Sequence, residues 1–228
     1  MAADAAAHAP AGREGTFVSL EGVDGCGKST QARALAERLR AAGLDVVSVR
    51  EPGGTTLGEK IRGILLDPAN GAMCDECELL LYEASRAQLV REVIEPALAR
   101  GSVVVCDRYL DSTFAYQAGG RGLDAGLVRS CNALGSCGVL PSRTLVLDLP
   151  EREALGRAVG TSGGADRIEA AGLALQRRVR DAYLDLARED PSRVRVVDAS
   201  GTPDEVARRV DEALAGLGLP LGEGVRRG

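Results

Sequence analysis

Five short apolar runs alternate with stretches of helical periodicity along the chain. The runs cover residues 16–21, 44–49, 103–106, 144–149 and 194–197. Their residues are mostly apolar and β-branched, without the polar alternation of half-exposed strands, as in strands that are covered on both faces. Such strands belong to parallel sheets. The pattern therefore predicts a five-stranded parallel sheet with helices on both faces.

The segments between the runs carry helix signals. Apolar residues recur at helical spacing between residues 32 and 42, and Gly43 ends that helix. A long helix is expected over residues 75–100. A last helix begins at Thr202, which can cap it, with Pro203 in the first turn and Glu205 completing a capping box. This alternation predicts a doubly wound α/β domain, whose ligands bind beyond the carboxyl ends of the strands.

The chain has 228 residues, which suits one domain with one core. We expect that domain to cover residues 16–215. Residues 1–15 are rich in Ala, Gly and Pro and are predicted to form a disordered N-terminal extension. Residues 216–228 are predicted to form a flexible C-terminal tail.

The chain is acidic, because 33 Asp and Glu residues outnumber 28 Lys and Arg residues and give a net charge of −5. This balance argues against nonspecific binding to nucleic acid or to an anionic membrane. No apolar run approaches the roughly 18–20 residues that span a bilayer. The N-terminus also lacks the basic and apolar regions of a secretory signal. We therefore expect a cytoplasmic protein. If it binds phosphates, it must do so through a few focused cations and not through a basic surface.

The six cysteines are expected to be reduced thiols in that compartment. Cys74 and Cys77 form one CxxC pair, and Cys131 with Cys137 is a possible partner pair. The second spacing is not that of a zinc knuckle, so a structural metal site is disfavoured.

A glycine-rich motif follows the first predicted strand. Residues 22–29 read GVDGCGKS and fit G-x-x-x-x-G-K-[ST] at every fixed position, with a helix expected directly after them. The glycines let backbone N–H groups surround phosphate oxygens. Lys28 should reach the β- and γ-phosphates of ATP, and Ser29 should ligate Mg²⁺. The predicted ATP-binding residues are Gly22, Val23, Asp24, Gly25, Cys26, Gly27, Lys28, Ser29 and Thr30.

A P-loop alone does not define a reaction. It occurs equally in GTPase switches, motors and regulatory nucleotide-binding modules. An N-K-x-D signature for guanine is absent, and the chain is short. A kinase that acts on a small acceptor is the simplest fit.

Three further motifs accompany the P-loop. Residues 50–55 (REPGGT) follow the second predicted strand, residues 107–109 (DRY) follow the third, and residues 166–169 (DRIE) lie near a presumed lid. In this order the chain resembles thymidylate kinases, from about residue 17 to about residue 215. The resemblance implies transfer of the γ-phosphate of ATP to dTMP, a mobile lid and a homodimer.

The resemblance also assigns cations to the acceptor side. Arg108 would clamp the acceptor phosphate, and Arg50 and Arg62 would be further phosphate-side cations. Asp107 would assist Mg²⁺ directly or through water. Two alternatives stay open at this point: Asp107 as a structural ion pair with Arg108, and Arg62 as a solvated helix charge.

Tyr82 and Arg86 are four residues apart and therefore share one helix face. A flat ring can stack on a pyrimidine, and a guanidinium can donate to a carbonyl on the base edge. In thymidylate kinases the matching positions stack on thymine and bind its O4. The alternative for Tyr82 is simple core packing.

The resemblance places four more residues around dTMP. Thr113 and Gln117 would contact the base, and Tyr116 would lie under the sugar and block a 2′-hydroxyl. Asp24 would bind the 3′-hydroxyl. An acid in a phosphate loop repels the bound nucleotide unless something uses its charge, so Asp24 is expected to be functional.

The source of the last catalytic cation is the main question that the sequence raises. Some thymidylate kinases carry a basic residue among the variable P-loop positions, and others carry arginines in the lid. Residues 23–26 include no basic residue, and residues 156–167 (GRAVGTSGGADR) include only Arg157 and Arg167. We expect Arg157 to lie nearest the transferred phosphoryl group, and Arg167 to pair with Asp166 or Glu169. The predicted catalytic set is Lys28, Asp107, Arg108, Arg157 and Arg167.

Two rival functions stay open on the sequence alone. One is a kinase for another nucleotide or for a nucleoside. The other is a non-catalytic nucleotide-binding protein with a degenerate lid, which would bind ATP without turning it over.

Overall fold

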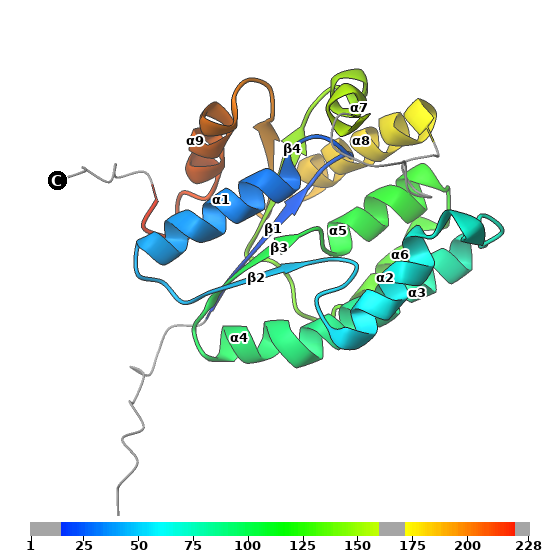
Figure 1. Cartoon of the computed structure of the whole chain (residues 1–228), viewed down its shortest axis with the longest axis horizontal. Helices are drawn as coiled ribbons and strands as arrows, with labels where there is room; N and C mark the ends of the chain where they lie inside the picture. Colours follow the sequence, from blue (N-terminus) through cyan, green and yellow to red (C-terminus); the bar gives the residue numbers. More distant parts are fainter. Residues whose placement is uncertain (1–14, 160–171, 222–228) are drawn as a thin grey trace, which may run out of the picture.

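A parallel sheet forms the centre of the molecule. The structure, a computed structural model, describes residues 15–159 and 172–221. Its five-stranded sheet has the order β2-β3-β1-β4-β5, and every neighbouring pair is parallel. The strands are β1 (Thr16–Glu21), β2 (Val46–Arg50), β3 (Val103–Asp107), β4 (Arg143–Asp148) and β5 (Val194–Asp198). The predicted α/β fold with a five-stranded parallel sheet is confirmed (Figure 1).

Helical segments connect the strands. In chain order they are α1 (Lys28–Ala41), α2 (Thr56–Leu66), η1 (Pro68–Asn70), α3 (Asp75–Leu89), η2 (Val90–Ile94), α4 (Glu95–Ala99), α5 (Leu110–Thr113), η3 (Phe114–Gly120), α6 (Ala125–Gly135), α7 (Glu151–Val159), α8 (Gly172–Glu189) and α9 (Pro203–Ala213). The segment η1 is a 3₁₀-helix, whereas η2 and η3 are π-helical. No helix among the described residues is long and apolar enough to cross a membrane.

The predicted strands all form, with ends that differ from the apolar runs by at most two residues. The helix expected over residues 75–100 is divided, because π-helical η2 separates α3 from α4. Pro96 lies at the start of α4 and has no N–H to donate to the turn before it, which accounts for altered bonding at this point. The capping box of α9 forms as predicted between Thr202 and Glu205.

Two apolar clusters cover the two faces of the sheet. Along β1, Phe17 packs into one cluster and Val18 into the other. The strand β3 alternates in the same way, with Val104 on one side and Val105 on the other. Figure 1 shows α1 and α9 together on one face and α4 on the opposite face. Both faces are therefore buried, which explains why the strand sequences are apolar at consecutive positions.

The strand register brings the predicted motifs to one edge. Leu20 of β1 lies opposite Asp107 of β3, and Arg50 of β2 lies opposite Asp107 on its other side. The P-loop, residues 22–29, leaves β1 at the same edge. Residues far apart in the sequence therefore meet beyond the carboxyl ends of the three neighbouring strands.

The described residues near the termini contact the core. The backbone N–H of Gly15 donates to the carbonyl of Leu98 at 3.1 Å. In the segment predicted as a tail, Leu217, Leu219 and Leu221 pack against the larger cluster. Residues 1–14 of the predicted extension, 222–228 of the tail and 160–171 of the presumed lid lie outside the described residues.

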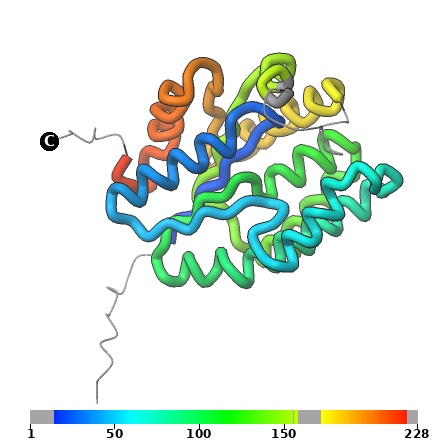
Figure 2. The backbone as a smooth tube through the Cα atoms, in the orientation of Figure 1, coloured from blue at the N-terminus to red at the C-terminus, as the bar shows by residue number. Residues whose placement is uncertain are grey.

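The helices α2, α3 and α6 lie side by side at one end of the molecule (Figure 2). The approach of α6 to α3 depends on Gly135. A Cβ atom at this position would lie 1.9 Å from Oε2 of Glu83, whose other oxygen accepts a hydrogen bond from Arg86 at 2.6 Å. The glycine thus lets α6 close over a buried charged group of α3.

Gly135→Ala is expected to destabilise the protein by about 1–3 kcal/mol, because the added methyl group must displace Glu83 from its buried site. The control is Gly63→Ala in α2, where a Cβ meets nothing within 4 Å. Since alanine favours helices, the control should be neutral or slightly stabilising. Urea unfolding of both variants measures the difference, and equal midpoints would show that α6 has room to shift.

Candidate active site

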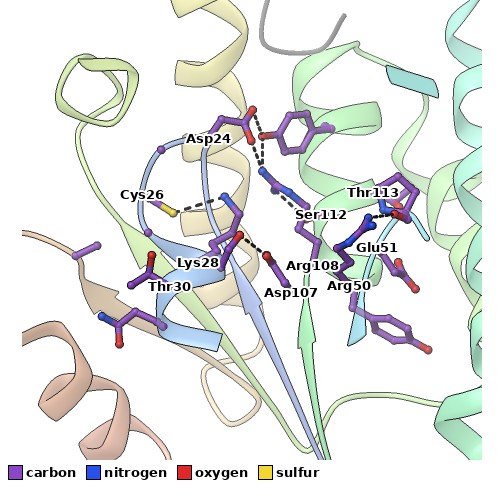
Figure 3. Close-up of a pocket in the computed structure, with 18 of the residues that line it drawn as sticks. Asp24, Cys26, Lys28, Thr30, Arg50, Glu51, Asp107, Arg108, Ser112 and Thr113 are labelled. Carbon is purple, nitrogen blue, oxygen red and sulfur yellow. Dashed lines mark hydrogen bonds and ion pairs between the residues drawn. The ribbon is translucent and has the colours of Figure 1, made fainter. Parts of the chain in front are cut away.

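A cavity of about 790 Å³ opens at the carboxyl edge of the sheet. Its walls come from the P-loop, the loop after β2, α3, the end of β3 and the segments α5 and η3 (Figure 3). Its size is typical of ligand sites. The predicted residues that line it are Asp24, Gly25, Cys26, Gly27, Lys28, Ser29, Thr30, Arg50, Arg62, Tyr82, Arg86, Asp107, Arg108, Thr113, Tyr116, Gln117 and Arg157. Gly22 and Val23 lie behind the lining, and Arg167 is outside the described residues.

The P-loop is held by its own residues. Gly22 has φ 134°, and a Cβ there would lie 2.6 Å from the carbonyl oxygen of Leu147, so only glycine fits. The side chain of Val23 is buried in the core. Its carbonyl accepts a hydrogen bond from Nζ of Lys28 at 2.7 Å. The lysine thus lies folded over the loop, and a bound phosphate would compete with the Val23 carbonyl for its ammonium group.

Ser29 and Asp107 meet at the mouth of the loop. The hydroxyl of Ser29 donates to Oδ2 of Asp107 at 2.5 Å (Figure 3). The two residues reach this point from the start of α1 and the end of β3. A hydroxyl and a carboxylate are the oxygen ligands that Mg²⁺ takes when substrate phosphates complete its shell. Both residues therefore fit a magnesium site at the phosphate end of the cavity.

Arg108 joins the P-loop to the end of β3. Its φ of 71° is unusual for a residue other than glycine, and such strained positions cluster at functional sites. The guanidinium donates to the carbonyl of Gly22 at 3.0 Å and forms an ion pair with Asp24. It also lies 5.1 Å from the ring centroid of Tyr116. Arg108 thus pairs with the acid of the P-loop, whereas Asp107 contacts Ser29.

Asp24 is satisfied from three directions. Besides Arg108, it accepts hydrogen bonds from the Tyr116 hydroxyl at 3.0 Å and from Nε2 of Gln176 at 2.9 Å. Burial acts to raise the pKa of Asp24, but the charges of Arg108 and Lys28 outweigh it and hold the pKa below its ordinary value. The carboxylate is therefore ionised at neutral pH.

A second carboxyl group lies beneath Arg108. Glu21, the last residue of β1, is fully buried and accepts hydrogen bonds from the hydroxyls of Ser112 and Tyr183. Burial and the nearby charge of Asp111 raise the pKa of Glu21 from 4.5 to about 8. The side chain is accordingly protonated at neutral pH, and it adds no negative charge below the arginine.

Arg86, on α3, lines the cavity and is almost completely buried, with 1% of its surface exposed. It contacts Glu51 at 2.7 Å and Glu83 at 2.6 Å. It also donates to Thr113 at 2.8 Å and to Asn132 at 3.0 Å. One guanidinium therefore faces two carboxyl groups. Burial and the charge of Glu83 raise the pKa of Glu51 to about 7, although Arg86 acts to lower it.

Four other predicted residues line the same cavity. Arg50 pairs with Glu59 at 3.0 Å, and Arg62 donates to the carbonyl of Pro52 at 3.0 Å. Arg62 lines the cavity and is bonded to the protein, which is unlike a solvated helix charge. Tyr82 lines the cavity and is only partly buried, so it is not simple core packing. Gln117 donates its amide to Glu78 at 2.9 Å.

Arg157, on α7, also lines the cavity. Its guanidinium pairs with Glu153 at 2.7 Å and donates to the carbonyl of Ala199 at 3.2 Å. Glu153 is exposed and Ala199 is buried, and 38% of the arginine side chain is exposed. The predicted partners of Arg167, which are Asp166 and Glu169, lie outside the described residues along with Arg167 itself.

The six cysteines are free thiols. Cys74 and Cys77 are exposed, and Cys26 is buried within the P-loop, with its sulfur 3.7 Å from Nζ of Lys28. Among the residues that the structure describes, no group of three or more His, Cys, Asp or Glu side chains could hold a metal ion.

Several residues of the site were not predicted from the sequence. Glu21 carried a signal, since it is an acid that ends an otherwise apolar strand. Gln176 and Tyr183 carried none, because a helix that packs onto the core shows only apolar periodicity. These unpredicted residues bind predicted ones directly or through one another, and they are Glu21, Glu51, Glu78, Glu83, Ser112, Arg121, Asn132, Gln176 and Tyr183.

The parallel sheet, the phosphate loop at the end of β1 and the arginine that binds this loop beside one cavity define a P-loop protein. Comparison with known proteins narrows the class. The thymidylate kinase family model matches residues 20–210. Thymidylate kinase of Syntrophotalea carbinolica is 49% identical over 85% of this chain and 92% of its own. That of Trichlorobacter lovleyi is 46% identical over 90% of this chain and 100% of its own.

A crystal structure of thymidylate kinase from Ehrlichia chaffeensis has the same fold, with a TM-score of 0.73 and 32% identity. The match covers 88% of this chain and 98% of that one. The chain belongs to the thymidylate kinase family.

The raised pKa of Glu21 predicts a pH-dependent stability. Between pH 4.5 and about 8 the folded state holds a proton that the unfolded state releases, so the free energy of unfolding falls as pH rises. Glu21→Gln imitates the protonated form. It should match the wild type near pH 5 and exceed its stability near pH 9 by on the order of 2–4 kcal/mol.

Denaturant unfolding at a series of pH values measures this difference. Glu37→Gln, at an exposed position of α1, is the control and should follow the wild-type curve. Parallel curves for wild type and Glu21→Gln would mean that Glu21 is ionised in the folded protein.

Proposed function

We propose that the protein transfers the γ-phosphate of ATP to dTMP and releases ADP and dTDP, a step in the synthesis of dTTP for DNA replication. The enzyme is a dTMP kinase. The observation that carries this proposal is a single cavity that is lined by the P-loop, by Arg108 and by Arg157, in a chain of the thymidylate kinase family. Donor and acceptor phosphates would meet between these groups.

The donor end binds ATP. The N–H groups of the P-loop surround the phosphates, and Lys28 turns from the Val23 carbonyl toward the β- and γ-phosphates. Ser29 and Asp107 would hold Mg²⁺, which neutralises charge on the β- and γ-oxygens when bound. The cofactor of the proposed reaction is thus Mg²⁺, and ATP is the donor.

The acceptor end binds dTMP. The phosphate of dTMP competes with Asp24 for the guanidinium of Arg108, because both are anions beside the same cation. Once Arg108 has turned to the phosphate, Asp24 can accept a hydrogen bond from the 3′-hydroxyl of the sugar. The ring of Tyr116 lies next to both groups, in a position to exclude a 2′-hydroxyl. Arg50 and Arg62 add positive charge on the same side.

The thymine base would stack on Tyr82 and accept a hydrogen bond at O4 from Arg86. The guanidinium of Arg86 is already occupied by Glu51, Glu83, Thr113 and Asn132. The base carbonyl therefore has to share the donor that Arg86 gives to Thr113. Thr113 then turns its hydroxyl toward the base edge.

In the reaction, an oxygen of the dTMP phosphate attacks the γ-phosphorus of ATP. A new P–O bond forms while the bond to the bridging oxygen breaks, and its electron pair leaves with ADP. The acceptor phosphate is ionised near neutral pH, so no general base is needed. Negative charge spreads over the transferring oxygens, and a cation placed there lowers the barrier. Arg157 is the proposed cation, assisted by Arg167 from the lid.

Arg157→Ala should lower kcat for dTMP by roughly a hundredfold or more and leave KM for dTMP nearly unchanged. Stability should change little, because its ion pair with Glu153 is exposed. The matched control is Arg152→Ala, at an exposed position of the same helix. Near-normal turnover of Arg157→Ala, with loss in Arg167→Ala, would assign the catalytic role to Arg167.

The reaction itself is tested by ADP release from ATP in the presence of single acceptors. We expect release with dTMP and Mg²⁺ and none without an acceptor. Faster release with another nucleotide or a nucleoside would contradict the proposed substrate. Binding of ATP without release for any acceptor would identify a non-catalytic module.

We also propose that the protein works as a homodimer in the cytoplasm, where its free thiols stay reduced. Exposed apolar side chains gather on the adjacent helices α2, α3 and α6, which supports an interface there. On these helices, Leu134 is 81% exposed and Leu80 is 61% exposed. The further exposed apolar residues are Leu57, Ile64 and Leu127.

Leu134→Asp should convert the dimer to a monomer, because a charge in an apolar contact loses its hydration without a partner. Val196→Asp, at an exposed position of the edge strand β5, is the control and should stay dimeric. Sedimentation velocity distinguishes the two states. A monomeric wild type would refute the dimer, and a dimeric Leu134→Asp would place the interface elsewhere.

A further inference from the structure

We propose that Glu78 and Arg121 select the base by fixing the amide of Gln117, so that the site accepts a pyrimidine with an N–H at ring position 3 and rejects one with a bare nitrogen there. This inference rests on the proposed dTMP kinase activity. Glu78 and Arg121 act as positioning residues, since neither lines the cavity.

The three side chains form a chain of contacts from the surface to the cavity. Arg121 donates to Glu78 through Nε at 3.2 Å and through Nη2 at 3.1 Å. Glu78, which is 1% exposed, accepts the amide Nε2 of Gln117 at 2.9 Å. Gln117 is also 1% exposed and lines the cavity. The negative charge of Glu78 is therefore balanced by Arg121, which lies outside the cavity lining, and Gln117 separates both from a base bound in the cavity.

The chemistry of Glu78 determines which way the amide points. An ionised carboxylate only accepts hydrogen bonds, and the paired guanidinium favours its ionised form. The NH₂ group of Gln117 must therefore face Glu78. Its carbonyl oxygen, Oε1, makes no hydrogen bond to any of the described residues. The side-chain amide of Gln117 is thus held in one orientation, with Oε1 left to accept a hydrogen bond from a ligand.

This arrangement matches one base edge and opposes another. Thymine carries a hydrogen on N3, which can donate to Oε1 of Gln117. Cytosine has a lone pair at N3, which would face the lone pairs of Oε1. Cytosine also has an amino group in place of O4, opposite the donors of Arg86. The wrong base thus leaves polar groups unpaired or opposed in a dry site, and such mismatches discriminate strongly.

The position of Gln117 adds to its selectivity. It lies in η3, the π-helical segment that also carries Tyr116, and its backbone carbonyl accepts a hydrogen bond from the backbone N–H of Leu123 at 3.0 Å. The backbone N–H of Arg121 donates to the carbonyl of Tyr116 at 2.8 Å. The backbone is therefore fixed on both sides. Rotation of the terminal amide is the freedom that Glu78 removes.

The test compares kcat/KM for dTMP, dCMP and dUMP in wild type and in Glu78→Gln. The amide that replaces Glu78 can donate as well as accept, so the amide of Gln117 becomes free to turn its NH₂ group to the base. The ratio of dTMP to dCMP should fall by about tenfold or more, mainly through KM. The ratio of dTMP to dUMP should stay the same, because uracil and thymine share the same N3 and O4 groups.

Glu76→Gln is the matched control, since it removes the same charge from an exposed position in the first turn of α3. Its two ratios should equal those of the wild type. If Glu78→Gln loses activity in equal proportion on all three acceptors, Glu78 is structural and the inference fails, while the kinase assignment stands. A wild type without dTMP-dependent ADP release would instead refute the proposed function.

A second variant keeps the test valid if Glu78→Gln does not fold. Arg121→Gln retains both Glu78 and Gln117 but removes the positive charge beside Glu78. Burial then favours the protonated form of the Glu78 carboxyl group, which can donate a hydrogen bond to Gln117. The dTMP to dCMP ratio should fall again. Arg121→Lys restores a positive charge and should recover part of the ratio. Unchanged ratios in both Arg121→Gln and Glu78→Gln would overturn the inference.

Discussion

The contact between Arg108 and Asp24 connects the two halves of the site. Arg108 extends from the end of β3, and Asp24 lies in the loop that leaves β1, so their ion pair ties the acceptor side to the phosphate loop. Arg108 takes a strained backbone conformation to reach this point. Arg108 also donates to Ser112, which is held in turn by Glu21, and the raised pKa of Glu21 keeps this side chain neutral. A substrate phosphate would bind Arg108, which is already in position, by replacing Asp24 as its anionic partner.

The same principle recurs around the cavity. The chain is acidic overall, yet several of the cations that line its site are held by carboxyl groups, as Arg86 is by Glu51 and Glu83 and Arg50 is by Glu59. Pairing keeps long side chains in one rotamer before a ligand arrives, so less conformational entropy is lost on binding. It also prevents the self-repulsion that several unpaired arginines in one pocket would cause. The site can thus attract anionic ligands through a few fixed cations, without a basic protein surface.

The sequence predicts the sheet and most of the cavity, because their signals are local. Apolar runs predict the strands, and the spacing of GVDGCGKS predicts the phosphate loop without any tertiary information. The partners of the predicted residues could not be found this way. Gln176 lies 152 positions from Asp24, and Tyr183 lies 162 positions from Glu21, so only the packing of α8 against the core brings them together. The π-helical segments were also missed, since apolar periodicity does not distinguish them from α-helix.

The π-helical form of η3 restricts how the length of this segment can vary. Seven residues, Phe114–Gly120, have a wider turn than an α-helix of the same length. Removing one residue would let the segment return to α-helical bonding, so that the residues within it would rotate around the helix axis while those after it would keep their positions. Gln117 would then leave the cavity wall although its identity had not changed. The segment should therefore tolerate exchanges of side chains far better than insertions or deletions, and sequence alignments of functional relatives should show no gaps across it.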